Sequence, residues 1–264
     1  MRLLTSDEVK KHELDILLDV KDFCEKNDIC FYLMGGTLLG AIRHRGFIPW
    51  DDDIDIGMPR PDYERFLKTY KSPKGYISMS NLLGNWINPF AKVIDPETKV
   101  VSYISDNEPG LWIDIFPIDG LPSNMNDAKK LYAKCAIYRS LFSCVFSKLG
   151  EGKTILRKYA KYILKPIALF IGANYLSKKV DEIAHTCRYE DAKYVGVITW
   201  GLHGIGELMP KDEFEKKVLV DFEGHKMPAY SCWKLYLSNL YGNYMQLPPE
   251  NQRYTHSMDV YIKD

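Results

Sequence analysis

The stretch PWDDDIDIG, residues 49–57, places four aspartates within five positions and then returns to apolar residues. Neighbouring carboxylates repel one another, so a folded chain usually spreads them apart. The flanks are apolar, because FIPW ends at Trp50 and isoleucines at positions 54 and 56 interleave with the last acids. A solvated acidic turn is the alternative, but such a turn does not normally alternate with buried-type side chains. We therefore interpret the run as a strand that carries a functional acidic site.

Strand geometry predicts how these carboxylates are arranged. Successive side chains of a strand point to opposite faces, so Asp51, Asp53 and Asp55 are expected on one face, and Ile54 and Ile56 on the core side. Two carboxylates at positions i and i+2 can share one divalent cation, and their hard oxygens suit Mg²⁺ or Mn²⁺. A bound metal would offset the repulsion, so the pattern predicts a metal site.

A further carboxylate is expected from LWIDIFPIDG, residues 111–120. Asp114 stands between isoleucines in an otherwise apolar strand, where an unpartnered charge is costly. It is predicted either to join the metal site or to pair with an internal Arg or Lys. Asp119 precedes a glycine and is predicted to be a turn residue.

Shortly before the aspartates lies MGGTLLGAIRHRG, residues 34–46. Paired glycines between a strand and a helix let backbone N–H groups approach an anion at the helix N-terminus. Arg43, His44 and Arg45 add positive charge nearby. The segment is neither a Walker loop nor a G-x-G-x-x-G motif. It therefore predicts a phosphate-approaching turn of another type.

The chain of 264 residues is expected to fold as one α+β catalytic domain, 1–264, with residues 125–190 as an appended basic helical segment. No signal peptide is recognised, and the uncharged run 166–177 is too short to cross a bilayer. An amphipathic helix is predicted over 6–26, capped by Thr5 or Ser6. Further helices are predicted at 60–70, about 126–185 and 230–240, strands at 29–34, 53–58, 76–79, 90–94, 99–104, 111–116 and 194–200, a hairpin around Glu223, and an ordered loop after 240.

The formal net charge is zero, yet residues 128–180 hold twelve Lys and Arg and one acid, Glu151. One helical stripe is expected to carry the cations Lys153, Arg157, Lys158, Lys161 and Lys165. This basic amphipathic helix predicts either contact with an anionic membrane or an ordinary solvated face. No nucleic-acid motif accompanies it, so nucleic acid is not an expected partner. We expect a cytoplasmic protein, peripheral on the inner face of the membrane if the helix binds lipid.

The order strand, Gly-Gly turn, helix, Asp-x-Asp and a later third Asp resembles the nucleotidyltransferase (polymerase β-like) superfamily. The fuller strings narrow this to a resemblance to the LicD/fukutin family over roughly 29–120 and 214–256. They are GGTLLGAIRHRGFIPWDDDIDIGMPRPDYERF, FAKVIDPET, LWIDIFPIDG, FEG followed by MP, and YLSNLYGNYMQLPP followed by Arg and His. The resemblance implies a nucleotidyltransferase-type mixed sheet with flanking helices.

The resemblance also implies the reaction. Members of this family transfer a phosphate-linked group from a CDP-activated donor to a glycan, so phosphocholine transfer from CDP-choline to teichoic acid or lipopolysaccharide, with release of CMP, is the leading expectation. A lipid-linked glycan is the expected acceptor. Two alternatives stay open: a true nucleotidyltransferase that adds NMP to a small molecule or RNA, and a non-catalytic scaffold that binds glycan or membrane.

Site residues follow from the same resemblance, position by position. Asp53, Asp55 and Asp114 are implied as the ligands of Mg²⁺ or Mn²⁺, and Asp51 as a further ligand or general base. Asp52, on the opposite strand face, is not expected to be catalytic. The implied substrate and nucleotide contacts are Gly35, Gly36, Thr37, Arg43, Lys92, Arg253 and His256.

Overall fold

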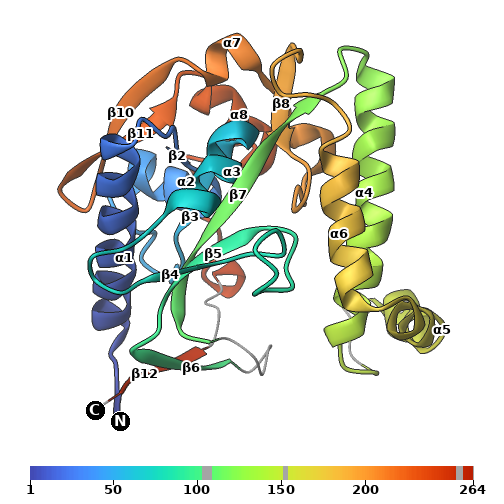
Figure 1. The fold of residues 1–264 in the computed structure, drawn as a ribbon, viewed down its shortest axis with the longest axis horizontal. Coiled ribbons are helices and arrows are strands. Elements are labelled where there is room, and N and C mark those ends of the chain that lie inside the picture. The colour runs from blue at the N-terminus through green and yellow to red at the C-terminus, as the bar shows by residue number, and fades with distance from the viewer. Residues whose placement is uncertain (103–108, 151–153, 254–257, 264) are drawn as a thin grey trace.

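The computed structural model describes residues 1–102, 109–150, 154–253 and 258–263, and it has the expected α+β architecture (Figure 1). A mixed seven-stranded sheet runs in the order β2-β3-β7-β5-β4, and β8 pairs with β7 and β9. The long strand β7 lies at its centre. The strands of this sheet are β2 (Tyr32–Leu33), β3 (Asp55–Pro59), β4 (Ile77–Met79), β5 (Ala91–Asp95), β7 (Leu111–Leu121), β8 (Tyr194–Val197) and β9 (Met209–Pro210).

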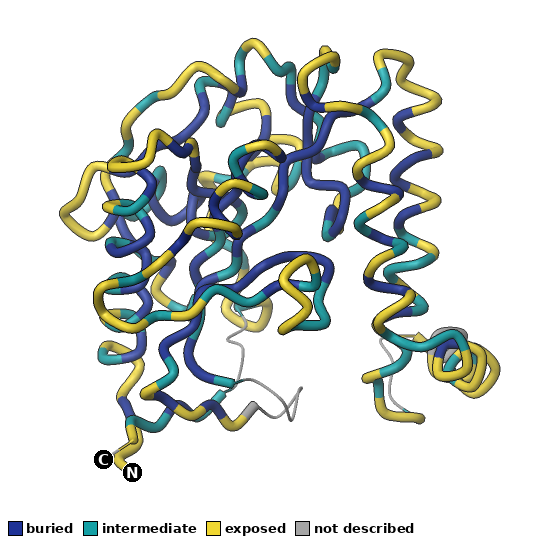
Figure 2. Tube along the Cα trace, viewed as in Figure 1, coloured by how far each residue is buried: buried dark blue, intermediate teal, exposed yellow. Residues whose placement is uncertain are grey.

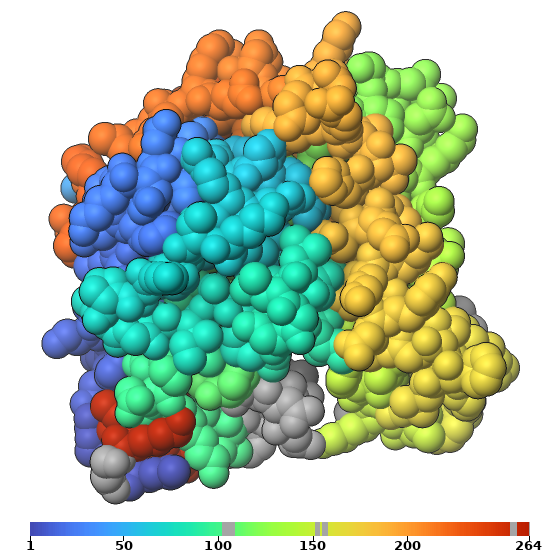
Figure 3. All heavy atoms as spheres, in the orientation of Figure 1, coloured from blue at the N-terminus to red at the C-terminus, as the bar shows by residue number. Residues whose placement is uncertain are grey.

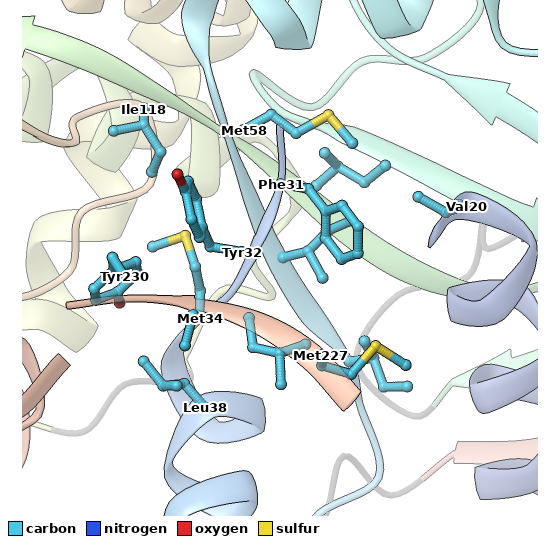
Figure 4. Packing of buried hydrophobic residues seen from close by; sticks show 14 of the residues in the cluster. Val20, Phe31, Tyr32, Met34, Leu38, Met58, Ile118, Met227 and Tyr230 are labelled. Carbon is cyan, nitrogen blue, oxygen red and sulfur yellow. The ribbon is translucent and has the colours of Figure 1, made fainter. Parts of the chain in front are cut away.

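Helices and core clusters hold this sheet in place. Helix α1 (Ser6–Lys26) begins after Thr5, one of the two predicted caps, and Thr5 forms a capping box with Glu8. Helices α2 (Gly35–His44) and α3 (Arg60–Thr69) follow β2 and β3 directly. Figure 4 shows side chains of α1, α2, β2, β3, β7 and β11 meeting in the main core. This core fixes the backbone from which the acidic residues project.

Two smaller sheets flank the central one. Strands β1 (Arg2–Leu3), β12 (Met258–Ile262) and β6 (Thr98–Ser102) bring the two termini together, and β12 was not predicted. The hairpin of β10 (Lys217–Phe222) and β11 (His225–Tyr230) turns at Glu223 and Gly224, as predicted. The remaining short elements are η1 (Gly204–Glu207), α7 (Lys211–Phe214), α8 (Trp233–Tyr241) and η2 (Glu250–Gln252).

The basic segment is helical, as expected, and forms α4 (Met125–Phe146), α5 (Ile155–Ile171) and α6 (Ala173–Ala184). Helices α4 and α6 pack against each other beside the sheet, and α5 projects from their far end (Figure 1). None of the helices in the described residues is long and apolar enough to cross a membrane. That residues 1–264 form one catalytic domain, to which this segment is appended, stays a prediction.

A buried ion cluster joins this segment to the sheet. The Arg60 guanidinium donates to both oxygens of Asp119, at 2.6 and 2.8 Å, and to Asp181 on α6 at 2.8 Å. Asp119 lies inside β7 and is 1% exposed. The interpretation of Asp119 as a turn residue was therefore wrong, because its charge is satisfied by a cation from α3.

The strand predicted at 53–58 is shorter at its start than expected. Strand β3 begins at Asp55, and residues 51–54 have no regular structure. The alternation argument therefore does not apply to Asp51 and Asp53, which reach the site from a loop. Similarly, the strand predicted at 29–34 contracts to β2, because only Tyr32 and Leu33 pair with β3, and helix α2 starts at Gly35.

Candidate active site

Two of the predicted carboxylates lie side by side on neighbouring parallel strands. Asp55 opens β3, and Asp114 is its direct partner in the register of β7. Backbone hydrogen bonds fix this register, because the Asp114 N–H donates to the Ile54 carbonyl at 2.9 Å and the Met34 N–H donates to the Asp55 carbonyl at 3.0 Å. Directly opposed residues in a sheet hold their side chains close together, so the two carboxylates share one face.

Thr37 belongs to this arrangement in a way that the sequence did not indicate. Its hydroxyl accepts a hydrogen bond from the Asp55 N–H at 2.8 Å, and the side chain is buried. Thr37 therefore fixes the start of β3 against α2. The contact that the structure shows for its hydroxyl is with the protein backbone, and a contact with substrate stays a prediction.

The glycine pair lies against the aspartates. Gly35 has a φ of +50°, and a Cβ at this position would stand 3.0 Å from Asp55 Oδ2. A Cβ on Gly36 would stand 2.6 Å from Asp51 Oδ2, closer than real contacts allow. The two glycines thus let the N-terminus of α2 approach the carboxylates of Asp51 and Asp55. Partial positive charge at a helix N-terminus stabilises such carboxylates.

Lys92 is the internal cation beside Asp114. The two residues are paired in the β5–β7 register, and Lys92 Nζ lies 3.9 Å from Asp114 Oδ1. The lysine side chain is 4% exposed, and Nζ stands 3.7 Å from the centre of the Trp112 ring. The predicted pairing of Asp114 with an internal cation is therefore confirmed, and its role as a metal ligand stays a prediction.

The electrostatics of the cluster favour a cation. Burial and the charges of Asp53, Asp114 and Asp51 raise the pKa of Asp55 well above its ordinary value. Glu13 on α1 is 1% exposed, and burial followed by the charges of Asp53, Asp52 and Asp51 raises its pKa as well. Glu13 was not predicted, although a Glu among the apolar positions of an amphipathic helix was a visible signal.

The structure brings together two predicted phosphate contacts that are far apart in sequence. The guanidinium carbons of Arg43 and Arg253 lie 5.9 and 4.5 Å from the centre of the Trp50 ring. Trp50 immediately precedes the acidic run. Arg43 also donates to the Tyr244 carbonyl at 2.9 Å, which ties α2 to the C-terminal loop. Burial and the charge of Arg253 lower the pKa of Arg43. His256 lies outside the described residues.

Beside Asp55 opens a pocket of about 130 Å³ that sequence reasoning missed. Its lining includes Asp55, Glu207, Phe116, Trp200, Tyr236 and Tyr241. Glu207 ends η1 and is 5% exposed, and one of its carboxylate oxygens accepts a hydrogen bond from the His203 N–H at 3.4 Å. Burial raises the pKa of Glu207 to about 7. Part of the lining comes from β8, η1 and α8 and the residues beside them, which lie far along the chain from the aspartates. No local sequence pattern therefore predicted this pocket.

The donor set suits a hard divalent cation. Among the described residues, no three His, Cys, Asp or Glu side chains gather closely enough to enclose a metal ion alone. Mg²⁺ usually needs only one or two carboxylates and completes its shell with water and substrate phosphates. Asp55 and Asp114 meet that requirement, and the like charges that raise the pKa of Asp55 are what a cation would neutralise. The residues present therefore fit Mg²⁺, with Asp53 nearby.

A mixed sheet with two opposed carboxylates beside a glycine-opened helix defines an α+β domain of the nucleotidyltransferase type. Residues 28–141 match the family described as LicD/FKTN/FKRP, nucleotidyltransferase domain. The chain is 31% identical to the lipopolysaccharide cholinephosphotransferase LicD of Haemophilus influenzae, over 99% of this chain and 100% of that relative. It is 50% identical to the human ribitol 5-phosphate transferase FKRP over 34 residues, which are 13% of this chain and 7% of that relative. The chain belongs to the LicD family and is a LicD-type transferase.

Proposed function

We propose that this protein transfers phosphocholine from CDP-choline to a hydroxyl of a cell-surface glycan and releases CMP. Opposition of Asp55 and Asp114 under the Gly35–Gly36 turn is the observation that carries the proposal. The full-length similarity to a lipopolysaccharide cholinephosphotransferase supports transfer of a phosphocholine group to a lipopolysaccharide acceptor. Teichoic acid is a second acceptor that we propose on the family resemblance alone. Proteins of this kind act by positioning and charge neutralisation more than by covalent catalysis.

In the proposed reaction the acceptor oxygen attacks the phosphorus distal to cytidine. A new O–P bond forms, the bond to the bridging pyrophosphate oxygen breaks, and CMP leaves. Asp51, whose carboxylate lies against Gly36, accepts the proton of the attacking hydroxyl. The N-terminus of α2 and the Gly35 backbone provide the surface that a phosphoryl oxygen approaches.

Positive charge for the donor comes from two places. Lys92, fixed between Asp114 and Trp112, faces the reacting phosphoryl group. Arg43 and Arg253 around Trp50 hold the nucleotide portion, because guanidinium groups suit phosphate oxygens and an indole ring suits a base. Mg²⁺, held by Asp55 and Asp114 with Asp53 nearby, would neutralise the pyrophosphate when bound.

Product analysis tests the reaction class. The protein is incubated with Mg²⁺ and a lipid-linked glycan extract, and with CDP-choline, CDP-ethanolamine, CDP-glycerol, CDP-ribitol or CTP in parallel. We expect CMP and a glycan whose mass increases by phosphocholine. Release of pyrophosphate from CTP, with NMP added to an acceptor, would identify a true nucleotidyltransferase instead. Binding of glycan with no product from any donor would favour a scaffold.

We also propose that α5 docks the protein on an anionic membrane at the cytoplasmic face. The predicted cation stripe does not carry this proposal. Lys165 is half-buried, and its ammonium donates a hydrogen bond to the carbonyl of Ser147 at 2.6 Å. Ser147 is the C-cap residue of α4, so this cation is used at the end of that helix. Lys153 lies outside the described residues, and so does the side chain of Arg157. Lys158 is exposed, and Lys161 is half-buried.

An apolar surface supports the docking proposal better. Figure 2 shows α5 largely exposed, and Figure 3 shows it protruding from the body. Among the side chains of α5 that the structure describes, a narrow face that includes the buried Ala168 packs onto α4 and α6. Phe170 is 93% exposed and Ile163 is 70% exposed. Its other exposed apolar side chains are Tyr159, Tyr162, Leu164, Ile167 and Leu169. An apolar helix face in a segment with twelve basic residues fits an anionic bilayer interface.

A further inference from the structure

We propose that the pocket beside Asp55 is a recognition site for a quaternary ammonium head group, which makes the protein selective for choline among CDP-activated donors. The inference rests on the proposed function and adds the residues that choose the donor. The pocket is lined by Asp55, by Glu207 and by four aromatic side chains, which are Phe116, Trp200, Tyr236 and Tyr241. In phosphocholine one ester oxygen and two methylene groups separate the phosphorus from the nitrogen. A phosphoryl group held at Asp55 therefore places the ammonium among these side chains.

The aromatic walls are rigidly supported. The Trp200 ring packs edge-on against Phe90, with centroids 5.2 Å apart, and Phe90 in turn lies 4.8 Å from Phe116. Tyr236 is 2% exposed and packs edge-on against Tyr230 at 5.3 Å. Because these rings are fixed by their neighbours, they can present their faces to a ligand without first being ordered.

Tyr241 completes the pocket at its rim. Its side chain is 39% exposed, and its ring lies 6.0 Å from that of His203. Aromatic faces attract a cation within about 6 Å, and cages of such rings are a known means of binding quaternary ammonium groups. The four rings that line this pocket therefore match that ligand in chemistry.

The charge of the pocket has the matching sign. Asp55 is assigned above to the metal, so the carboxyl group of Glu207 remains for the head group, and among the described residues the lining includes no lysine or arginine. Arg139 is close enough to influence Glu207 electrostatically, yet its guanidinium is directed to the Ile198 carbonyl at 3.5 Å. A cationic head group would thus meet one carboxyl group and aromatic rings, and no lysine or arginine among the lining side chains.

The same chemistry disfavours the other head groups. A primary ammonium has three N–H donors, and apart from the Glu207 carboxyl group the ring faces do not replace the water that these donors lose. A polyol likewise needs several hydrogen-bond partners. A trimethylammonium group donates no hydrogen bonds and loses little when the rings surround it. The nucleotide portion is assigned above to a separate surface, where the guanidinium groups of Arg43 and Arg253 lie near the Trp50 ring.

Calorimetric titration of the intact protein in Mg²⁺ with CDP-choline, CDP-ethanolamine and CMP tests the site. We expect CDP-choline to bind roughly tenfold more tightly than CDP-ethanolamine. A difference of this size corresponds to the binding free energy that one cation–π interaction contributes. In Tyr241→Leu and Glu207→Gln, the affinity for CDP-choline should fall to within about threefold of the affinity for CDP-ethanolamine. The affinity for CMP should stay unchanged. Tyr241→Phe keeps a ring and should keep the preference for choline.

Tyr175→Leu is the matched control, because Tyr175 is 56% exposed on α6 and does not line the pocket. It should keep the wild-type order of affinities. Equal affinity of the wild type for the two donors, with CMP still bound, would overturn this inference and leave the transferase proposal standing. A loss of CMP affinity in Tyr241→Leu would also overturn it, because the pocket would then hold the base. Binding of none of the three ligands would overturn the proposed function as well.

Discussion

Asp55 and Asp114 are direct partners on two neighbouring parallel strands, and Lys92 on the next strand is the direct partner of Asp114. Two anions and one cation therefore lie in a row across β3, β7 and β5. Lys92 partly neutralises the acidic pair. The row explains why a sheet tolerates an aspartate at Asp114, flanked by buried isoleucines.

The Lys92–Asp114 contact predicts a strong coupling between the two side chains. Lys92→Met should lower the free energy of unfolding by about 3 kcal/mol, because it leaves a partly buried carboxylate without its cation. Asp114→Asn should also be destabilising on its own, and the double variant should recover part of the sum. Urea unfolding of the four proteins measures this cycle. Additive effects of the two changes would contradict the contact.

The close approach at Gly36 predicts a loss of turnover with little loss of stability. In Gly36→Ala the new methyl group would displace the Asp51 carboxylate, which is the free end of a side chain and can move. We expect at least a roughly tenfold lower kcat, or about 1.4 kcal/mol of transition-state stabilisation. Gly206→Ala is the control, because its nearest contact is an ordinary 3.4 Å. Unchanged kcat in Gly36→Ala would contradict a catalytic position for Asp51.

Burial of Glu207 predicts an unusual dependence of stability on pH. Its pKa rises from 4.5 to about 7 on folding, so the native state binds the proton more tightly than the unfolded state. The stabilisation from this proton is therefore complete below pH 4.5 and is lost as the pH rises through 7. In Glu207→Gln the metal-free protein should gain up to about 3 kcal/mol at pH 8 and almost nothing near pH 4.5. Denaturant unfolding at the two pH values gives the comparison, and an equal effect at both would refute it.

The exposed face of α5 predicts that membrane affinity depends on apolar side chains. Changing both Ile163 and Phe170 to Ser should strongly reduce sedimentation with anionic vesicles, because burial of such side chains contributes about 2 kcal/mol each. Turnover on a soluble acceptor fragment should not change. A matched Lys158→Gln variant should weaken binding less, by about 1 kcal/mol. Equal sedimentation of the double variant and the wild type would make α5 an ordinary solvated helix.

Local sequence patterns predicted those parts of the protein that local physics determines. A capping residue at Thr5 or Ser6 and the helical spacing after it located α1, and a charge within an apolar strand singled out Asp114. The opposition of Asp55 and Asp114 followed from neither pattern, because strand order depends on contacts between distant segments. The same holds for β12, which pairs with β6, and for the approach of Arg43 and Arg253 to Trp50.

The errors have equally specific causes. Asp119 before Gly120 was interpreted as a turn because no sequence pattern shows that Arg60 reaches it. Glu207 and the aromatic pocket come from short elements near the end of the chain, with no motif of their own. The cations of 153–165 were taken to be the outward stripe of α5, whereas the described part of the helix exposes mainly apolar side chains.

The rate of CMP release from CDP-choline, followed against Mg²⁺ concentration in Asp55→Asn and Asp52→Asn, tests the central claim most directly. Both substitutions remove one charge from the same acidic run, but Asp55 opposes Asp114 and Asp52 lies in the preceding loop. We predict that Asp55→Asn lowers the rate by about a thousandfold or more, as expected when roughly 4 kcal/mol of transition-state stabilisation is lost, and that Asp52→Asn keeps a Mg²⁺-dependent rate near that of the wild type. Wild-type release of CMP by Asp55→Asn, or release that is independent of Mg²⁺, would contradict the account.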